Sequence, residues 1–330
     1  MLEKHQIALL YAGGRQHPLK NQNALNRWNK EFIELEMVAT AEPMFIAGHT
    51  APDQPQILQR IARRIQREWN RYDGFIVTMD YAHVLYNANL LAFMLGRLSK
   101  PIVISTISHD DLATIAAGAK YPDIGLKASI VNATQMVTAQ AAGSFIAFGS
   151  SIIPVTHALV SEDKDHPGIY PASSAHGSVG GGYIDFGIQL LENQHALERV
   201  KPEIYVAYGE RVLYQVLTAG DIKDLQVEKK TRGLILDSRH ISLPVSAARL
   251  LPKKVPTLVL TSAAVLLYTN GRVTKITGLT PDCAAAKFTW LSGQRSVLAK
   301  LKNAMDQDFI GEHLRRVKPV KRAKSIKKRR

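Results

Sequence analysis

The sequence predicts an α/β protein of two domains: a larger N-terminal domain with a flavodoxin-like or Rossmann-like parallel sheet, and a smaller C-terminal α/β domain. Short apolar strand patterns alternate with amphipathic helical patterns through most of the chain, which is typical of a mainly parallel sheet covered on both faces. The first strand pattern ends in Gly13-Gly14, as strands of a doubly wound sheet do toward its ligand edge. A chain of 330 residues is long enough for two such domains.

The N-terminal half is expected to hold a strand, a loop and then alternating helices and strands. The apolar run 7–11 predicts the opening strand, and the polar, aperiodic residues 15–30 predict a mobile loop. Apolar residues at Ile57, Leu58, Ile61 and Ile65 have the spacing of an amphipathic helix over 54–70. The alternation continues with strands at 75–78, 102–105 and 144–148 and helices at 85–98 and 129–142.

The C-terminal half repeats this alternation after a segment without a clear period. Residues 162–187 are rich in Gly, Ser and Pro and have little period. Within them, HGSVGGG at 176–182 is interpreted as a flexible inter-strand loop; the alternative, a phosphate cradle, would need a preceding strand and a closing Lys-Ser/Thr. Thr280, Pro281 and Asp282 suit the N-cap, the first position and the first turn of a helix over 283–291. Strands are expected at 204–207, 233–236 and 257–261, with helices between them and a last helical stretch over about 294–316. We therefore divide the chain into domains at 1–195 and 202–315 and a tail at 316–330.

Composition indicates a globular protein of the cytoplasm. Hydrophobic residues make up 46% of the chain, and Cys283 is its one cysteine, so an intrachain disulfide and a multi-cysteine metal site are excluded. His109-Asp110-Asp111 has no second histidine at metal-ligand spacing and is interpreted as a solvated loop. The longest N-terminal apolar run is too short for a signal segment or a membrane span. We expect no cofactor, no metal and no membrane span.

Positive charge is concentrated at the C-terminus. The formal net charge is +14, and residues 315–330 hold ten Lys and Arg and no acidic residue. Such a block has almost nothing to bury, is expected to be disordered, and favours polyanions through counterion release. Nucleic acid is the first partner to consider and an anionic membrane surface the second; a purely solubilising appendage is the alternative. The residues assigned to polyanion binding are Lys321, Arg322, Lys324, Lys327, Lys328, Arg329 and Arg330.

Several segments in order along 7–315 resemble the L-asparaginase/glutaminase family. YDGFIVT at 72–78 leads into a helix that ends before Lys100-Pro101, like that family's strand, helix and KP junction. The other segments are LLYAGGR at 9–15, SIVNA at 129–133, GLILDSRHISLP at 233–244 and GLTPDCAAAKFTWL at 278–291. The resemblance implies the family's two-domain fold and, because its sites form at a dimer interface, a homodimer or homotetramer.

The resemblance also implies an ancestral chemistry. The family hydrolyses the side-chain amide of asparagine, and in some members glutamine. A threonine hydroxyl is the nucleophile, and a second threonine, an aspartate and a lysine activate it and relay protons. An Asp-Ser-Ser type loop holds the substrate's α-amino and α-carboxylate groups. Chemistry of this kind fails without the hydroxyl.

The catalytic positions implied by the resemblance hold other residues here. The threonines of the opening box fall on Ala12 and Arg15, and the threonine and aspartate of the central box fall on Tyr81 and Ala82. The relay lysine falls on Val160, with Lys164 one helical turn away, and the second-domain GxGN segment reads Arg239-His240-Ile241-Ser242. Because catalytic groups of this kind act as a unit, we expect ordinary asparaginase activity to be absent or very weak.

The replacement residues suggest a binding pocket. Arg15, His49, Thr50, Tyr81 and His83 are predicted to cluster around the old cleft, where Arg offers a fixed fork to a carboxylate or phosphate. The alternative is drift, with bulky side chains filling a disused cleft. Tyr81 as a substitute nucleophile would need a strong activator, because the pKa of a tyrosine is ordinarily about 10, and the sequence indicates none.

Two functional hypotheses remain. The first is a non-catalytic protein that binds a small anionic or amino-acid ligand, or serves as a scaffold, and carries a polyanion-binding tail. The second is a divergent amidohydrolase that still converts asparagine to aspartate plus ammonia, or acts on glutamine. The related subunit of tRNA-dependent amidotransferases is a variant of the second hypothesis, but that subunit needs the same threonines.

Overall fold

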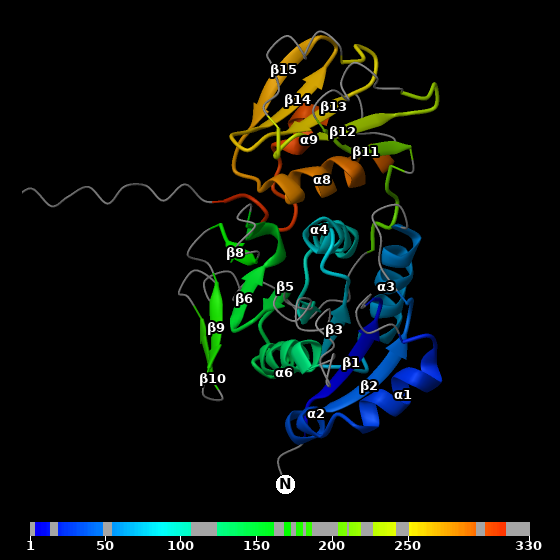
Figure 1. The fold of residues 1–330 in the computed structure, drawn as a ribbon, viewed down its shortest axis with the longest axis vertical. Coiled ribbons are helices and arrows are strands. Elements are labelled where there is room, and N and C mark those ends of the chain that lie inside the picture. The colour runs from blue at the N-terminus through cyan, green and yellow to red at the C-terminus, as the bar shows by residue number, and fades with distance from the viewer. Residues whose placement is uncertain are drawn as a thin grey trace, which may run out of the picture.

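Two α/β domains lie end to end in the computed structural model (Figure 1). The structure describes residues 4–13, 19–48, 55–106, 124–161, 168–172, 176–180, 183–186, 204–209, 211–218, 227–241, 251–294 and 301–314. The predicted fold class is confirmed: the N-terminal domain has a large mixed sheet, and the C-terminal domain has a five-stranded sheet with a long helix against it.

The N-terminal sheet has eight strands in the order β10-β9-β6-β5-β4-β3-β1-β2. Neighbouring strands from β2 to β5 pair in parallel, whereas β5–β6, β6–β9 and β9–β10 are antiparallel. The strands are β1 Gln6–Tyr11, β2 Thr40–Phe45, β3 Gly74–Thr78, β4 Pro101–Ser105, β5 Gly143–Phe148, β6 Ser151–Pro154, β9 Gly177–Gly180 and β10 Tyr183–Phe186. Strands β7 (Ala158–Val160) and β8 (Ile169–Pro171) form a separate two-stranded sheet.

Both faces of this sheet are covered, because successive side chains of each strand point to opposite sides. On β1, Ile7 and Leu9 join one apolar core with α1 (Gln22–Lys30), α2 (Ile33–Val38) and α6 (Ile124–Thr138). Ala8 and Leu10 join the other core, with α3 and α4. These two helices are α3 Pro55–Glu68 and α4 Val84–Leu95. The parallel strands therefore read as continuous apolar runs.

The C-terminal sheet runs in the order β11-β12-β13-β14-β15. Its last two strands form a hairpin around Asn270 and Gly271, which have φ of 50° and 74°. Positive φ at both central residues is what a two-residue hairpin turn requires. The elements of this domain are β11 Val212–Val216, β12 Gly233–Asp237, β13 Thr257–Leu260, β14 Val265–Thr269, β15 Arg272–Ile276, α8 Pro281–Gly293 and α9 Leu301–Met305.

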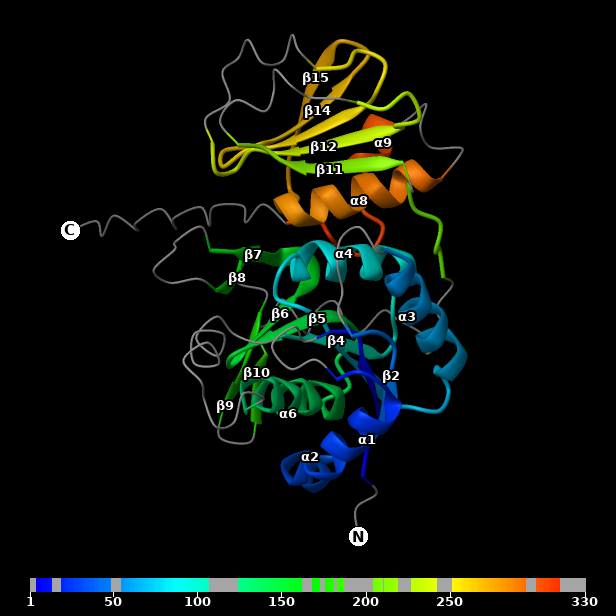
Figure 2. The same cartoon turned by 45° about the vertical axis from the view of Figure 1, so that its right-hand side comes forward.

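Helices α4 and α8 pack against each other between the two sheets, as Figures 1 and 2 both show. Every residue of α4 is buried, since one side faces its own sheet and another faces α8. Phe93 of α4 stacks on Trp290 of α8 with ring centroids 5.6 Å apart, and the hydroxyls of Tyr86 and Thr289 lie 3.0 Å apart. The two domains thus share one apolar core.

Most elements expected in the N-terminal half are confirmed within a few residues, but the loop expected over 15–30 is partly wrong. Residues 22–30 form α1, because the Asn21 side chain accepts a hydrogen bond from the Ala24 amide at 3.0 Å and Leu25 and Trp28 are buried. The loop expected over 176–182 is also partly wrong, because residues 177–180 form β9, whose backbone pairs with β6 and β10. Strands β8 and β10 likewise lie in the stretch 162–187, which has no clear period in the sequence.

The C-terminal expectations need more correction. Residues 204–207 are not a strand, and the first strand of this sheet is β11 at Val212–Val216. Of the last helix expected over 294–316, the described part contains α9, five residues long. No helix lies between β11 and β13 in the described residues of that stretch. The described helices include none that is long and apolar enough to cross a membrane.

Candidate functional site

The carboxyl ends of β1 and β3 meet at one edge of the N-terminal sheet, because the two strands are parallel neighbours. Ala12 follows β1 and is fully buried. Its amide donates to Thr78 Oγ1 at 3.2 Å, and the Thr78 hydroxyl donates to the carbonyl of Gly13 at 3.1 Å. The position of the family's first threonine therefore holds a methyl group, and the nearby threonine hydroxyl is committed to the backbone.

Gly13 is required by the close approach of this turn to the residues after β3. Its φ is +154°, and a Cβ there would meet Asp80 Oδ2 at 3.0 Å and the Asp80 amide nitrogen at 3.1 Å. A side chain at this position would force the two segments apart. The glycine of this turn therefore has a structural role of its own.

The hydroxyls at the end of β4 are also committed to structural hydrogen bonds. Thr106 Oγ1 donates to the carbonyl of Met79 at 2.9 Å, and Ser105 Oγ lies 2.8 Å from Ser129 Oγ. All three of these polar side chains are buried. These hydroxyls hold the strand ends in place through hydrogen bonds within the protein and are not directed toward a substrate.

Tyr81 occupies the position of the central threonine and behaves as a neutral phenol. Its ring lies 6.0 Å from that of Phe148, and its hydroxyl oxygen is buried without a hydrogen-bond partner. Burial and the neighbouring Tyr170 raise the pKa of Tyr81. With no base within hydrogen-bond distance among the described residues, its hydroxyl is poorly suited to nucleophilic attack.

The other predicted site residues are not assembled into a catalytic set. Ala82 and His83 are exposed, and His83 has a left-handed backbone, φ 63°, at the start of α4. Val160 is the last residue of β7, is 40% exposed and pairs with Ile169 of β8. Arg15, His49, Thr50, Lys164 and the seven tail residues lie outside the described residues, so the predicted anion pocket stays a prediction.

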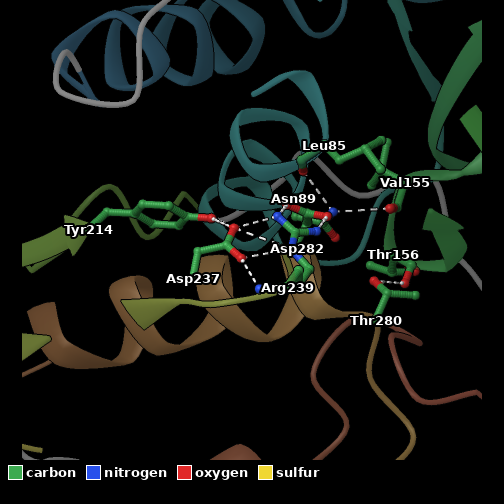
Figure 3. A network of polar contacts seen from close by, with 9 residues as sticks. All are labelled: Leu85, Asn89, Val155, Thr156, Tyr214, Asp237, Arg239, Thr280 and Asp282. Atoms are coloured by element: carbon green, nitrogen blue, oxygen red, sulfur yellow. Dashed lines mark hydrogen bonds and ion pairs between the residues drawn. The ribbon is translucent and has the colours of Figure 1, made fainter. Parts of the chain in front are cut away.

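A second polar cluster was not predicted from the sequence and lies at the end of β12 (Figure 3). Arg239, which stands in the GxGN-like segment, binds two carboxylates. Its Nη2 is 2.6 Å and its Nε 3.0 Å from the two oxygens of Asp237, and its Nη1 is 3.0 Å from Asp282 Oδ2. The two aspartates are 4% and 8% exposed, and Arg239 is 18% exposed. We call these three residues the Arg239 cluster.

The Arg239 cluster is anchored to the domain interface. The Tyr214 hydroxyl donates to Asp237 Oδ2 at 2.9 Å, and the Tyr214 ring packs against Tyr86 of α4 at 5.3 Å. Although burial raises it, the hydrogen bonds and charge of Arg239 hold the pKa of Asp237 below its ordinary value. Burial and the two aspartates raise the pKa of Tyr214, which stays protonated. The cluster is a fully partnered structural network with no free reactive group.

Another polar pair of the C-terminal domain is buried more deeply still. Lys287 of α8 and Glu312 are both 0% exposed, with Nζ and Oε1 2.7 Å apart. Lys287 also donates to the carbonyl of Met305, and Glu312 accepts from the amides of Phe309 and Ile310. The pair ties the segment after α9 to α8. Within the described ranges, no group of three or more His, Cys, Asp or Glu could hold a metal ion.

The sequence was compared with models of protein families and with curated proteins. Residues 12–160 match the family of the asparaginase N-terminal domain. No curated protein matches the chain by sequence.

Solved L-asparaginases share the fold along nearly the whole chain. The thermostable L-asparaginase from Thermococcus kodakarensis and L-asparaginase I from Vibrio cholerae each match with a TM-score of 0.65, at 16% identity, over 94% of this chain and 100% of theirs. The probable cytoplasmic L-asparaginase from Campylobacter jejuni matches with the same TM-score at 15% identity, over 92% of this chain and 100% of its own. At this identity the likeness shows the fold alone.

Proposed function

We propose that the chain is a non-hydrolysing member of the asparaginase family, whose N-terminal domain model matches residues 12–160. We propose further that a small ligand binds at the carboxyl ends of β1 and β3, around Ala12 and Tyr81, a place we call the strand-edge cleft. One observation carries this proposal: the nucleophile positions hold Ala12 and Tyr81, of which the first has no hydroxyl and the second has a buried phenol with a raised pKa and no base in reach. Catalysis by an activated hydroxyl needs a base or a lowered pKa.

The proposed ligand is a small anion or an amino acid. The unpartnered Tyr81 hydroxyl can donate to a carboxylate, phosphate or amide oxygen, and a buried hydroxyl that gains such a partner is favourable. Arg15, His49, Thr50 and His83 are the further side chains proposed to line this pocket, on the basis of the family resemblance. The resemblance likewise supports a homodimer or homotetramer, which sedimentation velocity would test.

Thermal unfolding tests ligand binding directly. Phosphate, acetate, L-aspartate and L-asparagine are each titrated against the chain, and we expect at least one to raise the melting temperature of the wild type and to raise that of Tyr81→Phe less. Tyr268→Phe, the same change in the C-terminal sheet, is the matched control and should respond as the wild type does. If no probe shifts the wild type, the cleft is not a small-ligand site.

We further propose that the tail binds a polyanion, with nucleic acid preferred. Its support is the run of ten Lys and Arg without an acidic residue over 315–330. Affinity for RNA should fall steeply as salt rises, since each phosphate contact releases counterions, and truncation after Val317 should weaken binding strongly. Salt-independent binding would contradict this.

Cytoplasmic localisation is proposed on two grounds. The single cysteine, Cys283, is buried and unpaired, which suits a reducing compartment. One structural relative is itself named a cytoplasmic L-asparaginase. Fractionation of cells that produce the chain, followed by detection of Cys283-containing peptides, would test this placement.

A further inference from the structure

Helix α3 carries a row of arginines on its outer side. Arg60, Arg63, Arg64 and Arg67 lie within the helix, and Arg71 follows in the turn after it. Steps of three, four, seven and eleven residues return to one side of an α-helix, which turns about 100° per residue. Four of the five side chains are exposed and Arg64 is half-buried. We call these five residues the arginine stripe.

The opposite side of α3 fixes the stripe in place. Ile57, Leu58, Ile61, Ala62 and Ile65 are buried in the core that α3 shares with α4 and the sheet. In both ribbon views α3 stands at the outer edge of the N-terminal domain, with α4 inside it (Figures 1 and 2). The arginines are therefore presented to solvent from a rigid, well-anchored helix.

The stripe has more positive charge than its neighbours neutralise. Glu68 is shared among three arginines: its carboxylate lies 3.2 Å from Arg64 Nε, 3.3 Å from Arg67 Nε and 4.0 Å from Arg71 Nη1. Arg71 also pairs with Glu42 at 2.7 Å. Two glutamates thus face five arginines, which leaves an excess of three positive charges on this side of the helix.

The stripe also has guanidinium donors to spare. Arg60 uses Nη2 to donate to the carbonyl of Ile46 at 2.6 Å. Arg63 makes no hydrogen bond or ion pair with any described residue. Each guanidinium carries five N–H donors in a fixed fork, so most donors of the stripe remain available to an incoming group.

A groove runs beside the stripe. It has a volume of about 410 Å³ and lies between β2, α1 and α3, with Gln22, Asn26, Phe45 and Arg64 on its walls. Its one acidic wall residue, Glu42, is already paired with Arg71. The Gln22 amide on its wall is committed to Asn26, Pro43 and Phe45, so the groove adds room beside the stripe and the arginines supply the donors for a phosphate.

We propose that the arginine stripe is a phosphate-backbone contact surface for nucleic acid. Arg matches phosphate geometry with two parallel hydrogen bonds. The helical part of the stripe, from Arg60 to Arg67, extends about 10 Å at 1.5 Å rise per residue, which is long enough to face more than one phosphate of a strand. Contacts of this kind set affinity and register without reading sequence.

Two other occupants fit the geometry less well. A membrane-surface helix inserts its apolar side between lipids, and that side of α3 is packed in the protein core. A protein partner needs apolar or aromatic anchors at the centre of its interface. The exposed large hydrophobic side chains among the described residues lie elsewhere, and none is on α3.

The test measures binding of a fluorescein-labelled, mixed-sequence single-stranded RNA to the full chain by anisotropy across a salt series. In Arg63→Gln/Arg67→Gln, the slope of log affinity against log salt should fall by about 1.4, from two lost phosphate contacts of about 0.7 each. Arg63→Lys/Arg67→Lys keeps the charge and should keep the slope, with affinity reduced a few-fold. Lys253→Gln/Lys254→Gln removes the same charge from an exposed site of the C-terminal domain and should bind as the wild type does.

To distinguish binding by the arginine stripe from binding by the tail, the salt series is repeated in a full-length chain in which Lys327, Lys328, Arg329 and Arg330 are replaced by Gln. If the stripe is a binding surface, its variant lowers the slope in this background too. An unchanged slope in both backgrounds, with circular dichroism and melting temperature as in the wild type, would overturn the proposal. So would a stripe variant that loses binding to phosphatidylserine vesicles but not to RNA, because the occupant would then be a membrane.

Discussion

The proposed strand-edge cleft and the Arg239 cluster both lie in segments that resemble functional segments of the asparaginase family, yet their polar groups are satisfied to very different degrees. At the strand edge, the buried hydroxyl of Tyr81 has no hydrogen-bond partner among the described residues. In the C-terminal domain, Arg239 is held by two carboxylates, those of Asp237 at the end of β12 and of Asp282 on α8. The first segment holds a polar group without a partner among the described residues, whereas the second holds a hydrogen-bonded network.

The Arg239 cluster is therefore interpreted as structural, and the strand edge at Tyr81 as the region that can accept a ligand. A buried polar group without a partner costs free energy, so it persists where stability is not the main constraint, as at ligand sites. A fully partnered network rigidifies the structure around it. We therefore interpret the Arg239 cluster as a network that stabilises the domain interface. At the proposed cleft, an external ligand would supply the hydrogen-bond partner that the Tyr81 hydroxyl lacks.

The largest expected effect comes from breaking the most deeply buried pair. Lys287→Met leaves the Glu312 carboxylate buried without a cation, and removal of one partner of such a pair typically costs about 3–5 kcal/mol. Urea unfolding should show this loss, whereas Lys302→Met on the exposed side of α9 should change stability little. A loss of less than about 1 kcal/mol for Lys287→Met would mean that the C-terminal network is not structural.

Arg239→Met should have the next largest effect, because it leaves Asp237 and Asp282 buried together without their cation. We expect a loss of about 2–3 kcal/mol, somewhat less than for a fully buried pair since Arg239 is partly exposed. Arg272→Met, an exposed arginine of β15, is the control. If Arg239→Met were as stable as the wild type, the Arg239 cluster would not stabilise the fold, and the contrast with the strand-edge cleft would be wrong.

The pH dependence of stability should separate the regions further. The pKa of Asp237 is lower in the folded protein than its unfolded value of about 3.9, so its contribution is fully present above that value. As pH falls below about 4, the unfolded chain takes up the proton first and this stability is lost. Melting temperatures between pH 6 and 3 should show a smaller acid loss in Arg239→Met than in the wild type; parallel curves would argue against the pairing.

Tyr81→Phe should have the smallest effect on stability. Removing an unpartnered buried hydroxyl sacrifices no hydrogen bond, so the change should lie within about 1 kcal/mol of the wild type and can be stabilising. The same urea titration measures it. A loss of more than about 2 kcal/mol would mean that the Tyr81 hydroxyl is held by the protein and that the cleft is as structural as the Arg239 cluster.

Several parts of the fold could be predicted from sequence because local signals were strong. Buried-strand runs and the Thr280-Pro281 helix start correctly predict β1, β3 and α8, although the Thr280 hydroxyl donates to the Thr156 carbonyl across the interface and does not cap its own helix. The hairpin at Asn270-Gly271 was missed even though Asn-Gly between alternating residues is a strong hairpin signal. Helix α1 was missed because its cap and two buried residues are few among polar neighbours.

A site could be predicted from the sequence only where the residue type at one position decides its chemistry. The loss of a hydroxyl at Ala12 follows from the residue type and the resemblance. The Arg239 cluster does not follow, because Asp282 lies 43 residues from Arg239 in the sequence and only the packed fold brings them together. The arginine stripe lies between these cases: its spacing is visible in the sequence, but its exposure depends on which side of α3 is buried.

Ammonia release from L-asparagine, and then from L-glutamine, by the purified full-length chain tests the loss of hydrolysis most directly. We predict no release above that of a heat-inactivated sample, both for the wild type and for Tyr81→Phe. Turnover at ordinary enzymatic rates, which have a median near 10 per second, would contradict the loss of hydrolysis, and its disappearance in Tyr81→Phe would identify that phenol as the nucleophile.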